Sequence, residues 1–238
     1  MSGRIWNLIW EEHFDGSEIN KNTWGYEIGK IRNNELQYYT DRKENAYLQD
    51  SCLVIEGRKE SFMDSGYTSA SLNTRGKKSF LYGKIEMYAK LPYGQGIWPA
   101  FWTLGENIRE VGWPKCGEID IMELVGGTGN KELGDDKVLA NIHSPSKIPP
   151  IKNNSYILKQ GKYADDFHII GCVWTEKNIS WYVDGDMYCS ADISDIEAFH
   201  KPQYILVNLA IGGNWPGDPD ETTMFPQKYY IDYIRYYD

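Results

Sequence analysis

Short segments in which apolar and polar residues alternate recur along the whole chain, and this pattern constrains the fold most. They lie at residues 53–56, 83–91, 119–124, 168–174, 179–183, 205–210 and 229–237, separated by stretches rich in Gly, Asn, Asp and Pro. A period of two is typical of half-buried β-strands. Helical patterns are scarce, and only residues 194–199 fit one or two turns. The sequence therefore predicts an all-β fold, an antiparallel β-sandwich or jelly roll with a long concave face.

We expect one domain over residues 1–238, because the chain has no internal repeat, low-complexity tract or linker. Sandwiches of this length commonly enclose a single core. The formal net charge of −9 argues against nucleic acid or an anionic membrane as a partner, since both require a basic face. No apolar run approaches the length of a membrane span. Phosphate-binding glycine motifs are missing, so we expect no organic cofactor.

Four scattered cysteines are expected to be reduced thiols in or near the core: Cys52, Cys116, Cys172 and Cys189. None belongs to a Cys-x-x-Cys pair, which argues against a structural zinc site or a dithiol redox motif. Cys172 and Cys189 flank a predicted hairpin, so a disulfide between them stays open and would require suitable Cβ geometry.

The most specific chemical signal is the heptapeptide GEIDIME at residues 117–123. Strand alternation places Glu118 and Asp120 on one face and the two intervening isoleucines on the other. Unbroken alternation would turn Glu123 into the core, where an unpaired carboxylate is costly. We therefore expect a β-bulge near residues 121–122 that returns Glu123 to the face of the other two acids.

A row of three acids suits a retaining glycosidase. Discounting the bulge, Glu118 and Glu123 are four strand steps apart, roughly 13 Å between Cα atoms. Leaning side chains can bring the carboxyls to about 5–6 Å, the spacing at which one attacks and the other serves as acid and then base. Asp120 between them raises at least one pKa through its like charge. A Ca²⁺ or Mg²⁺ site and a solvated acidic face remain alternatives for this peptide alone.

Aromatic residues are abundant, with 9 Trp, 18 Tyr and 7 Phe making up 14% of the chain. Composition alone favours the core for most of them. A sugar-binding cleft would use them as well, because a flat ring matches the apolar face of a pyranose.

Several motifs give the chain a resemblance to family 16 glycoside hydrolases, especially laminarinase-like endo-β-1,3-glucanases. EIDIME at residues 118–123 matches the longer, bulged form of the family signature. The other matching segments are NNELQYY at 33–39, YGKIE at 82–86, GQGIWPAFW at 94–102, WP at 113–114 and NLAIGGNWPG at 208–217. These segments cover most of the chain and are highly specific as a set.

The resemblance implies a β-jelly roll with an open cleft and a retaining double displacement. In that scheme Glu118 is the nucleophile, Glu123 is the general acid/base, and Asp120 tunes the pair. The residues alone do not order the two glutamates, which are chemically symmetric without a substrate. The cleft or catalytic-support positions implied by the resemblance are Asn33, Glu35, Trp98, Trp102, His143 and Trp215.

Local sequence leaves a second interpretation open for four of these residues. Trp98 has apolar neighbours and Trp102 follows an apolar residue, so core packing is an alternative for both. Trp215 lies in a Gly/Pro-rich loop, which favours an exposed binding role over a place in the core. His143 follows the acid strand and is either a hydrogen-bonding partner of Asp120 or Glu123 or a structural histidine.

Departures from the family pattern bear on the substrate and on metal binding. Ala70-Ser71 stands where the family usually has an Arg, and the loops at 126–137 and 147–154 are idiosyncratic, so the exact linkage preference stays open. Many relatives hold Ca²⁺ on the convex face. Asp232 matches a ligand of that ion, whereas Glu12-His13 departs from the usual acidic pair, so a structural Ca²⁺ is an expectation that rests on Asp232 alone.

The expected activity is endo-hydrolysis of β-1,3 bonds in a neutral β-glucan, laminarin or a mixed β-1,3/1,4-glucan. We expect a monomer that is secreted or exposed at the cell surface in its native form, although this chain starts without a secretion signal. One alternative is the same mechanism on a galactan such as agar or carrageenan, which ranks lower because sulfated chains favour basic subsites. Another is a non-catalytic lectin, which would need aromatic rings but no row of acids.

Overall fold

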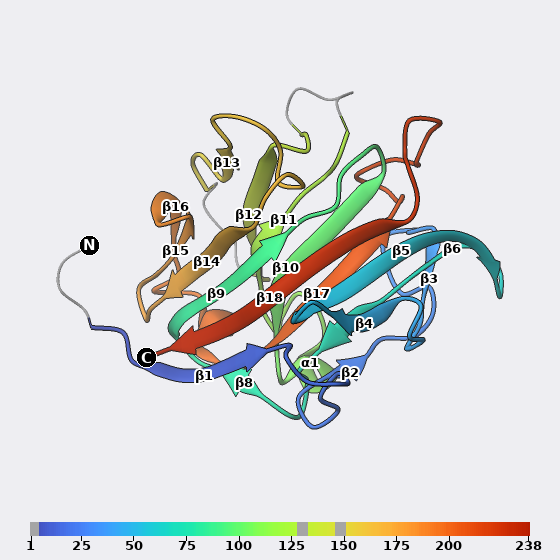
Figure 1. Ribbon diagram of the computed structural model, residues 1–238. Helices are drawn as coiled ribbons and strands as arrows, with labels where there is room; N and C mark the ends of the chain where they lie inside the picture. Colours follow the sequence, from blue (N-terminus) through green and yellow to red (C-terminus); the bar gives the residue numbers. More distant parts are fainter. Residues whose placement is uncertain (1–4, 128–132, 146–150) are drawn as a thin grey trace.

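The computed structural model describes residues 5–127, 133–145 and 151–238, and strands dominate these parts of the chain (Figure 1). Two sheets form a sandwich, and every strand pair in them is antiparallel except β3 with β6. The predicted antiparallel sandwich of the jelly-roll type is confirmed. Among the described residues, no helix is long and apolar enough to cross a membrane.

The larger sheet has ten strands, of which β9, β18 and β5 run side by side in Figure 1. In sheet order the strands are β16 (Asp186–Asp192), β15 (Asn178–Val183), β14 (His168–Trp174), β9 (Gly83–Lys90), β18 (Gln227–Tyr237), β5 (Cys52–Phe62), β6 (Ser65–Ser69) and β3 (Gln37–Tyr39). Two more strands pair with members of this row: β1 (Leu8–His13) with β18, and β4 (Ala46–Gln49) with β5.

The smaller sheet has eight strands and carries the acid segment near its middle. Its order is β13 (Ser155–Ile157), β12 (Lys137–His143), β11 (Glu118–Glu123), β10 (Ile97–Gly105), β17 (Gln203–Ile211), β7 (Ser71–Asn73) and β2 (Gly25–Tyr26), with β8 (Ser79–Phe80) beside β17. In the described parts of the chain, helical structure is limited to α1 (Ile108–Val111) and a 3-10 turn at Glu197–His200. The helical turns expected at 194–199 therefore form a few residues later.

The core lies between the sheets and fixes the orientation of β11. Ile119 and Ile121 are buried in it, which leaves the acids of the same strand on the opposite face. The indole nitrogen of Trp181 on β15 donates to the carbonyl oxygen of Asp120 at 2.9 Å. This bond joins the larger sheet to β11 directly behind the acids.

All four cysteines are free and buried, as predicted. Cys172 on β14 and Cys189 on β16 both pair with Trp181 of β15, so a whole strand separates them. Two strand spacings amount to about 9–10 Å, whereas a disulfide needs Cα atoms within about 7 Å. The disulfide left open for this pair is therefore absent.

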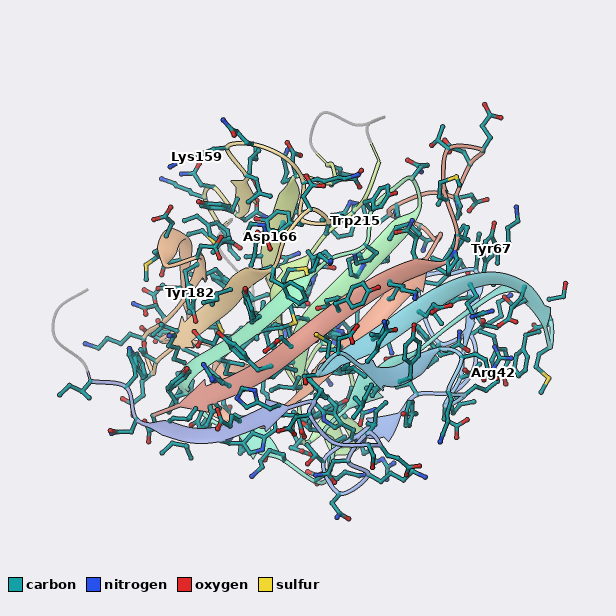
Figure 2. The ribbon with its side chains drawn as sticks, in the orientation of Figure 1. Arg42, Tyr67, Lys159, Asp166, Tyr182 and Trp215 are labelled. Carbon is teal, nitrogen blue, oxygen red and sulfur yellow. The ribbon has the colours of Figure 1, made fainter. Side chains whose placement is uncertain are left out.

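Gly171 on β14 leaves the space that the ring of Tyr182 occupies (labelled in Figure 2). A Cβ atom at Gly171 would lie 2.4 Å from Tyr182 Oη and 2.5 Å from the carbonyl oxygen of Ile85. The ring cannot move away freely, because the Tyr182 hydroxyl donates to buried Glu86 at 2.8 Å. We expect Gly171→Ala to lower the free energy of unfolding by about 1–3 kcal/mol, measured by urea denaturation.

Gly66 on β6 provides the matched control, because a Cβ atom there would meet nothing within 4 Å. Gly66→Ala should change the free energy of unfolding by less than about 0.5 kcal/mol. Equal losses at the two glycines would contradict the steric explanation.

Candidate active site

The acid strand contains the predicted β-bulge. Glu118, Asp120 and Glu123 pair with residues of β10 that are two positions apart, namely Leu104, Trp102 and Ala100. On the other side, the register with β12 also shifts between Asp120 and Glu123. The extra residue of the bulge turns Glu123 to the side of the sheet that carries Glu118 and Asp120. Along the partner strand β10, the two glutamates are four residues apart.

A cavity of about 400 Å³ opens over this face. The three acids line it together with side chains from β10, β17 and the segment before β3. Four of the six supporting residues expected from the sequence also line it: Asn33, Glu35, Trp98 and Trp102. The other two, His143 and Trp215, lie beside lining residues, as described below.

Several groups around Glu118 favour its ionised form, although its pKa is raised on balance. The indole nitrogen of Trp113 donates to Glu118 Oε2 at 2.8 Å, and His143 Nε2 lies 3.7 Å from Oε1. Burial raises the pKa of Glu118, and His143, Trp113 and the nearby guanidinium of Arg32 oppose that rise. Sequence reasoning did not single out Arg32, because a lone arginine in a loop is usually solvated.

Glu123 has the surroundings of a protonated carboxyl. It is buried, and the Trp98 indole nitrogen donates a hydrogen bond to its Oε1 atom at 3.2 Å. Burial, followed by the negative charges of Asp120 and Glu118, raises the pKa of Glu123 well above its ordinary value of 4.5. Two glutamates that the sequence leaves equivalent therefore differ in how strongly their surroundings raise the pKa, and Glu123 is the better acid candidate.

Asp120 lies between the glutamates and close to His143. Burial and the charge of Glu118 raise the pKa of Asp120 well above its ordinary value. Its Oδ2 atom lies 3.3 Å from His143 Nε2, closer than Glu118 does. His143 thus lies beside the acid row, because the register of β11 and β12 places it directly opposite Glu118.

Glu35 is a buried carboxylate held by three donors. Asn33 Nδ2 donates to its Oε1 atom at 3.2 Å, while Gln37 Nε2 and the Tyr39 hydroxyl donate to Oε2 at 2.6 and 3.2 Å. Burial raises the pKa of Glu35, and these hydrogen bonds oppose the rise. These hydrogen bonds hold Asn33 and Glu35 at the cavity wall. The segment at residues 33–39 therefore positions side chains of the site.

Trp102 faces the cavity, and its ring is partly covered. The indole nitrogen donates to Asn208 Oδ1 at 2.7 Å, and the Arg32 guanidinium carbon lies 4.9 Å from the ring centroid. Arg32 also pairs with Glu27, whose carboxylate accepts from Ser71 Oγ at 2.6 Å. The guanidinium of Arg32, which comes from the segment before β3, thus lines the cleft. Ala70-Ser71 stands where the family usually has an Arg, so this chain brings its arginine from another segment.

Three other tryptophans form aromatic surfaces around the acids. The ring of Trp98 meets that of Trp215 edge to face, with centroids 5.4 Å apart (Trp215 is labelled in Figure 2). Trp215 and Trp113 remain exposed, at 40% and 59% respectively. Exposed indole rings beside a cavity that contains carboxylates suit the stacking of pyranose rings.

Asp232 lies on β18, in the sheet that does not carry the acids. Ca²⁺ takes six to eight oxygen ligands. Within the described ranges, the only group of three or more metal-ligating side chains is Glu118, Asp120 and His143, so no such group includes Asp232. The side chains around Asp232 do not by themselves form a calcium site, and the Ca²⁺ expectation stays untested.

Comparison with known proteins places the chain among carbohydrate-active relatives. The model of glycosyl hydrolases family 16 matches residues 20–235. The laminarinase catalytic domain from Thermotoga maritima MSB8, crystallised with cetyltrimethylammonium bromide, is 44% identical, covers 99% of both chains and gives a TM-score of 0.88. The beta-glucanase of Rhodothermus marinus is 36% identical over 98% of this chain and 85% of its own.

Some curated relatives are much longer than this chain. The glucan endo-1,3-beta-glucosidase A1 of Niallia circulans is 34% identical over 97% of this chain, which spans 38% of the relative. The similarity therefore concerns one domain of that larger protein.

Proposed function

The chain belongs to family 16 of the glycosyl hydrolases, and we propose that it cleaves internal β-1,3 bonds of a neutral β-glucan such as laminarin, with retention at C1. The observation that carries this proposal is the pair Glu118 and Glu123 on one face of a cleft, in surroundings that raise the pKa of Glu123 more strongly than the pKa of Glu118. The names of its relatives, which include endo-1,3-beta-glucanases, support a β-glucan as the substrate.

In the proposed mechanism, ionised Glu118 attacks C1 while protonated Glu123 gives its proton to the glycosidic oxygen. The C1–O bond breaks, the shortened glucan leaves with the proton, and a covalent ester joins C1 to Glu118. Glu123, now ionised, takes a proton from water, which attacks C1 and releases Glu118. Burial and the neighbouring acids raise the pKa of Glu123, which helps to restore its protonated form for the next cycle.

A panel of polysaccharides tests the proposal. Laminarin, lichenan, agar and carrageenan are incubated with the protein, and the release of reducing ends is measured. We expect release from laminarin, with the β-anomer formed first in NMR spectra. Release from the galactans alone would contradict the choice of sugar. Binding to glucan without product at any pH would favour a lectin instead.

Arg32 gives a prediction about substrate binding. Its side chain lines the cavity over Trp102, and its Nη1 atom has no hydrogen-bond partner. A sugar hydroxyl would supply the missing acceptor after a small shift of the guanidinium. We expect Arg32→Ala to lower kcat/KM on laminarin by about 10- to 100-fold, mainly through KM, because one charge-assisted hydrogen bond is lost.

Arg42 is the matched control for Arg32 (labelled in Figure 2). Its guanidinium lies 4.3 Å from the centroid of Phe62 and pairs with Glu60, yet it does not line the cavity. Arg42→Ala should leave KM unchanged even if it destabilises the fold. Equal rises in KM for both variants would indicate a structural effect rather than lost binding.

We also propose that the native protein acts outside the cell, because a long glucan cannot enter a cell. We further propose that it acts as a monomer. Cell fractionation and size-exclusion chromatography test the two parts separately. The Ca²⁺ expectation at Asp232 is tested by calorimetric titration of Ca²⁺ into chelator-treated protein.

A further inference from the structure

Two acids of the cleft and His143 present three metal-ligating atoms within 4.8 Å of one another. His143 Nε2 lies 3.3 Å from Asp120 Oδ2 and 3.7 Å from Glu118 Oε1. No second group of this kind occurs in the parts of the chain that the structure describes. The trio comes from the neighbouring strands β11 and β12, so strand pairing holds its members in place.

The two separations measured from His143 are close to those in the coordination shell of a small divalent ion. Zn²⁺ binds imidazole nitrogen and carboxylate oxygen at about 2.0–2.2 Å, and a tetrahedral shell of that size separates its ligand atoms by about 3.3–3.5 Å. The two distances from His143 lie within a few tenths of an ångström of that range. Side-chain rotation alone would complete three corners of the tetrahedron, and water from the cleft would fill the fourth.

An independent observation is the unpartnered oxygen of Asp120. Asp120 is only 3% exposed, and its Oδ2 atom is buried and accepts no hydrogen bond, although His143 Nε2 lies 3.3 Å away. A buried acceptor without a donor is costly, and a cation would satisfy it. Trp113 holds the other oxygen of Glu118, Oε2, and leaves Oε1 towards His143, as an outer-shell partner of a metal ligand does.

We propose that Glu118, Asp120 and His143 bind Zn²⁺ and that the bound ion inhibits glycoside hydrolysis; the inhibitory part rests on the proposed function. Zn²⁺ occupies the Oε1 lone pair of Glu118, so this carboxylate no longer attacks C1. The ion also holds His143 and Asp120 together across the sugar-binding face. Glucan and Zn²⁺ therefore compete for the same side chains. Mg²⁺ binds more weakly, because it prefers six oxygen ligands and rarely accepts imidazole.

Calorimetric titration of Zn²⁺ into the substrate-free protein at pH 7.5 tests the site without using activity. We expect one Zn²⁺ per chain, with affinity lowered at least about 10-fold in His143→Ala. His168→Ala is the matched control, because His168 lies 2.7 Å from Asp184 in a histidine–aspartate pair without a third ligand. Unchanged Zn²⁺ affinity in His143→Ala, or no binding to the wild type at millimolar Zn²⁺, would overturn the site.

Inhibition is measured separately on laminarin. Zn²⁺ should raise the apparent KM and leave kcat unchanged, EDTA should restore the rate, and Mg²⁺ at the same concentration should have no effect. If the protein binds one Zn²⁺ through His143 but hydrolyses no glucan, the proposed function fails and the metal site stands. If it hydrolyses laminarin and Zn²⁺ neither binds nor inhibits, the metal site fails alone.

Discussion

Glu118→Ala is expected to lower kcat on laminarin by at least about 10⁴-fold, because loss of the nucleophile removes the covalent step altogether. Release of reducing ends measures the loss, and thermal unfolding checks that the variant is folded. Glu176→Ala is the matched control, since Glu176 is an exposed glutamate in the turn before β15. It should keep the full rate. A rate above one tenth of wild type in Glu118→Ala would refute the assignment.

Azide separates a nucleophile from a general acid. In Glu118→Ala the removed carboxylate leaves room for azide, which attacks C1 of a glucoside with a good leaving group such as fluoride. A C1–N bond forms and fluoride departs, which yields the glycosyl azide of inverted configuration. The same treatment of a Glu123 variant should give the azide of retained configuration, because Glu118 still forms the ester. The opposite pattern would exchange the two roles.

Glu123→Gln is expected to lower kcat on laminarin by about 10²–10⁴-fold, the usual contribution of a general acid. The rate of the first step should fall much less with an aryl glucoside such as a 2,4-dinitrophenyl glucoside, because its leaving group departs without a proton. Pre-steady-state release of the phenol measures that step. An equal loss with both substrates would indicate that Glu123 does not donate the proton.

The pH dependence follows from the direction of the pKa shift. Burial and the charges of Asp120 and Glu118 raise the pKa of Glu123 well above 4.5, so the acid stays protonated past that pH. Wild-type kcat/KM should fall as the pH rises through the raised pKa. On laminarin, the residual activity of Glu123→Gln should lose this fall, because an amide does not titrate.

The free energy of unfolding should also change over the pH range in which Glu123 titrates. A raised pKa means that folded Glu123 holds its proton more tightly than the unfolded chain does. This contribution to stability is complete below pH 4.5 and is lost as the pH rises through the folded pKa. The free energy of unfolding of Glu123→Gln minus that of wild type should therefore be larger at pH 8 than at pH 4. Urea denaturation at both pH values measures this change, and its absence would contradict the electrostatic explanation.

Several of the strands that could be predicted, such as β9 and β18, have one face in the core and a less buried opposite face, whereas β17 is buried throughout. All seven predicted segments are strands of the structure. Strand β10 escaped prediction because residues 97–105 are almost all buried and show no alternation. Its outer face forms part of the cleft floor, where Trp98, Ala100 and Trp102 replace polar residues. Strands of two to four residues, such as β2 and β7, are too short to show a period.

The sequence by itself determined which acids share a face. The period of a strand and the cost of burying Glu123 are both local, and together they require the bulge that the structure contains. Only the tertiary structure decided how the two glutamates differ. Trp113, His143 and Arg32 favour the anion of Glu118, whereas Glu123 receives one indole and faces two like charges. These partners come from segments far apart in the chain, and the electrostatic energy depends on distances that no strand period encodes.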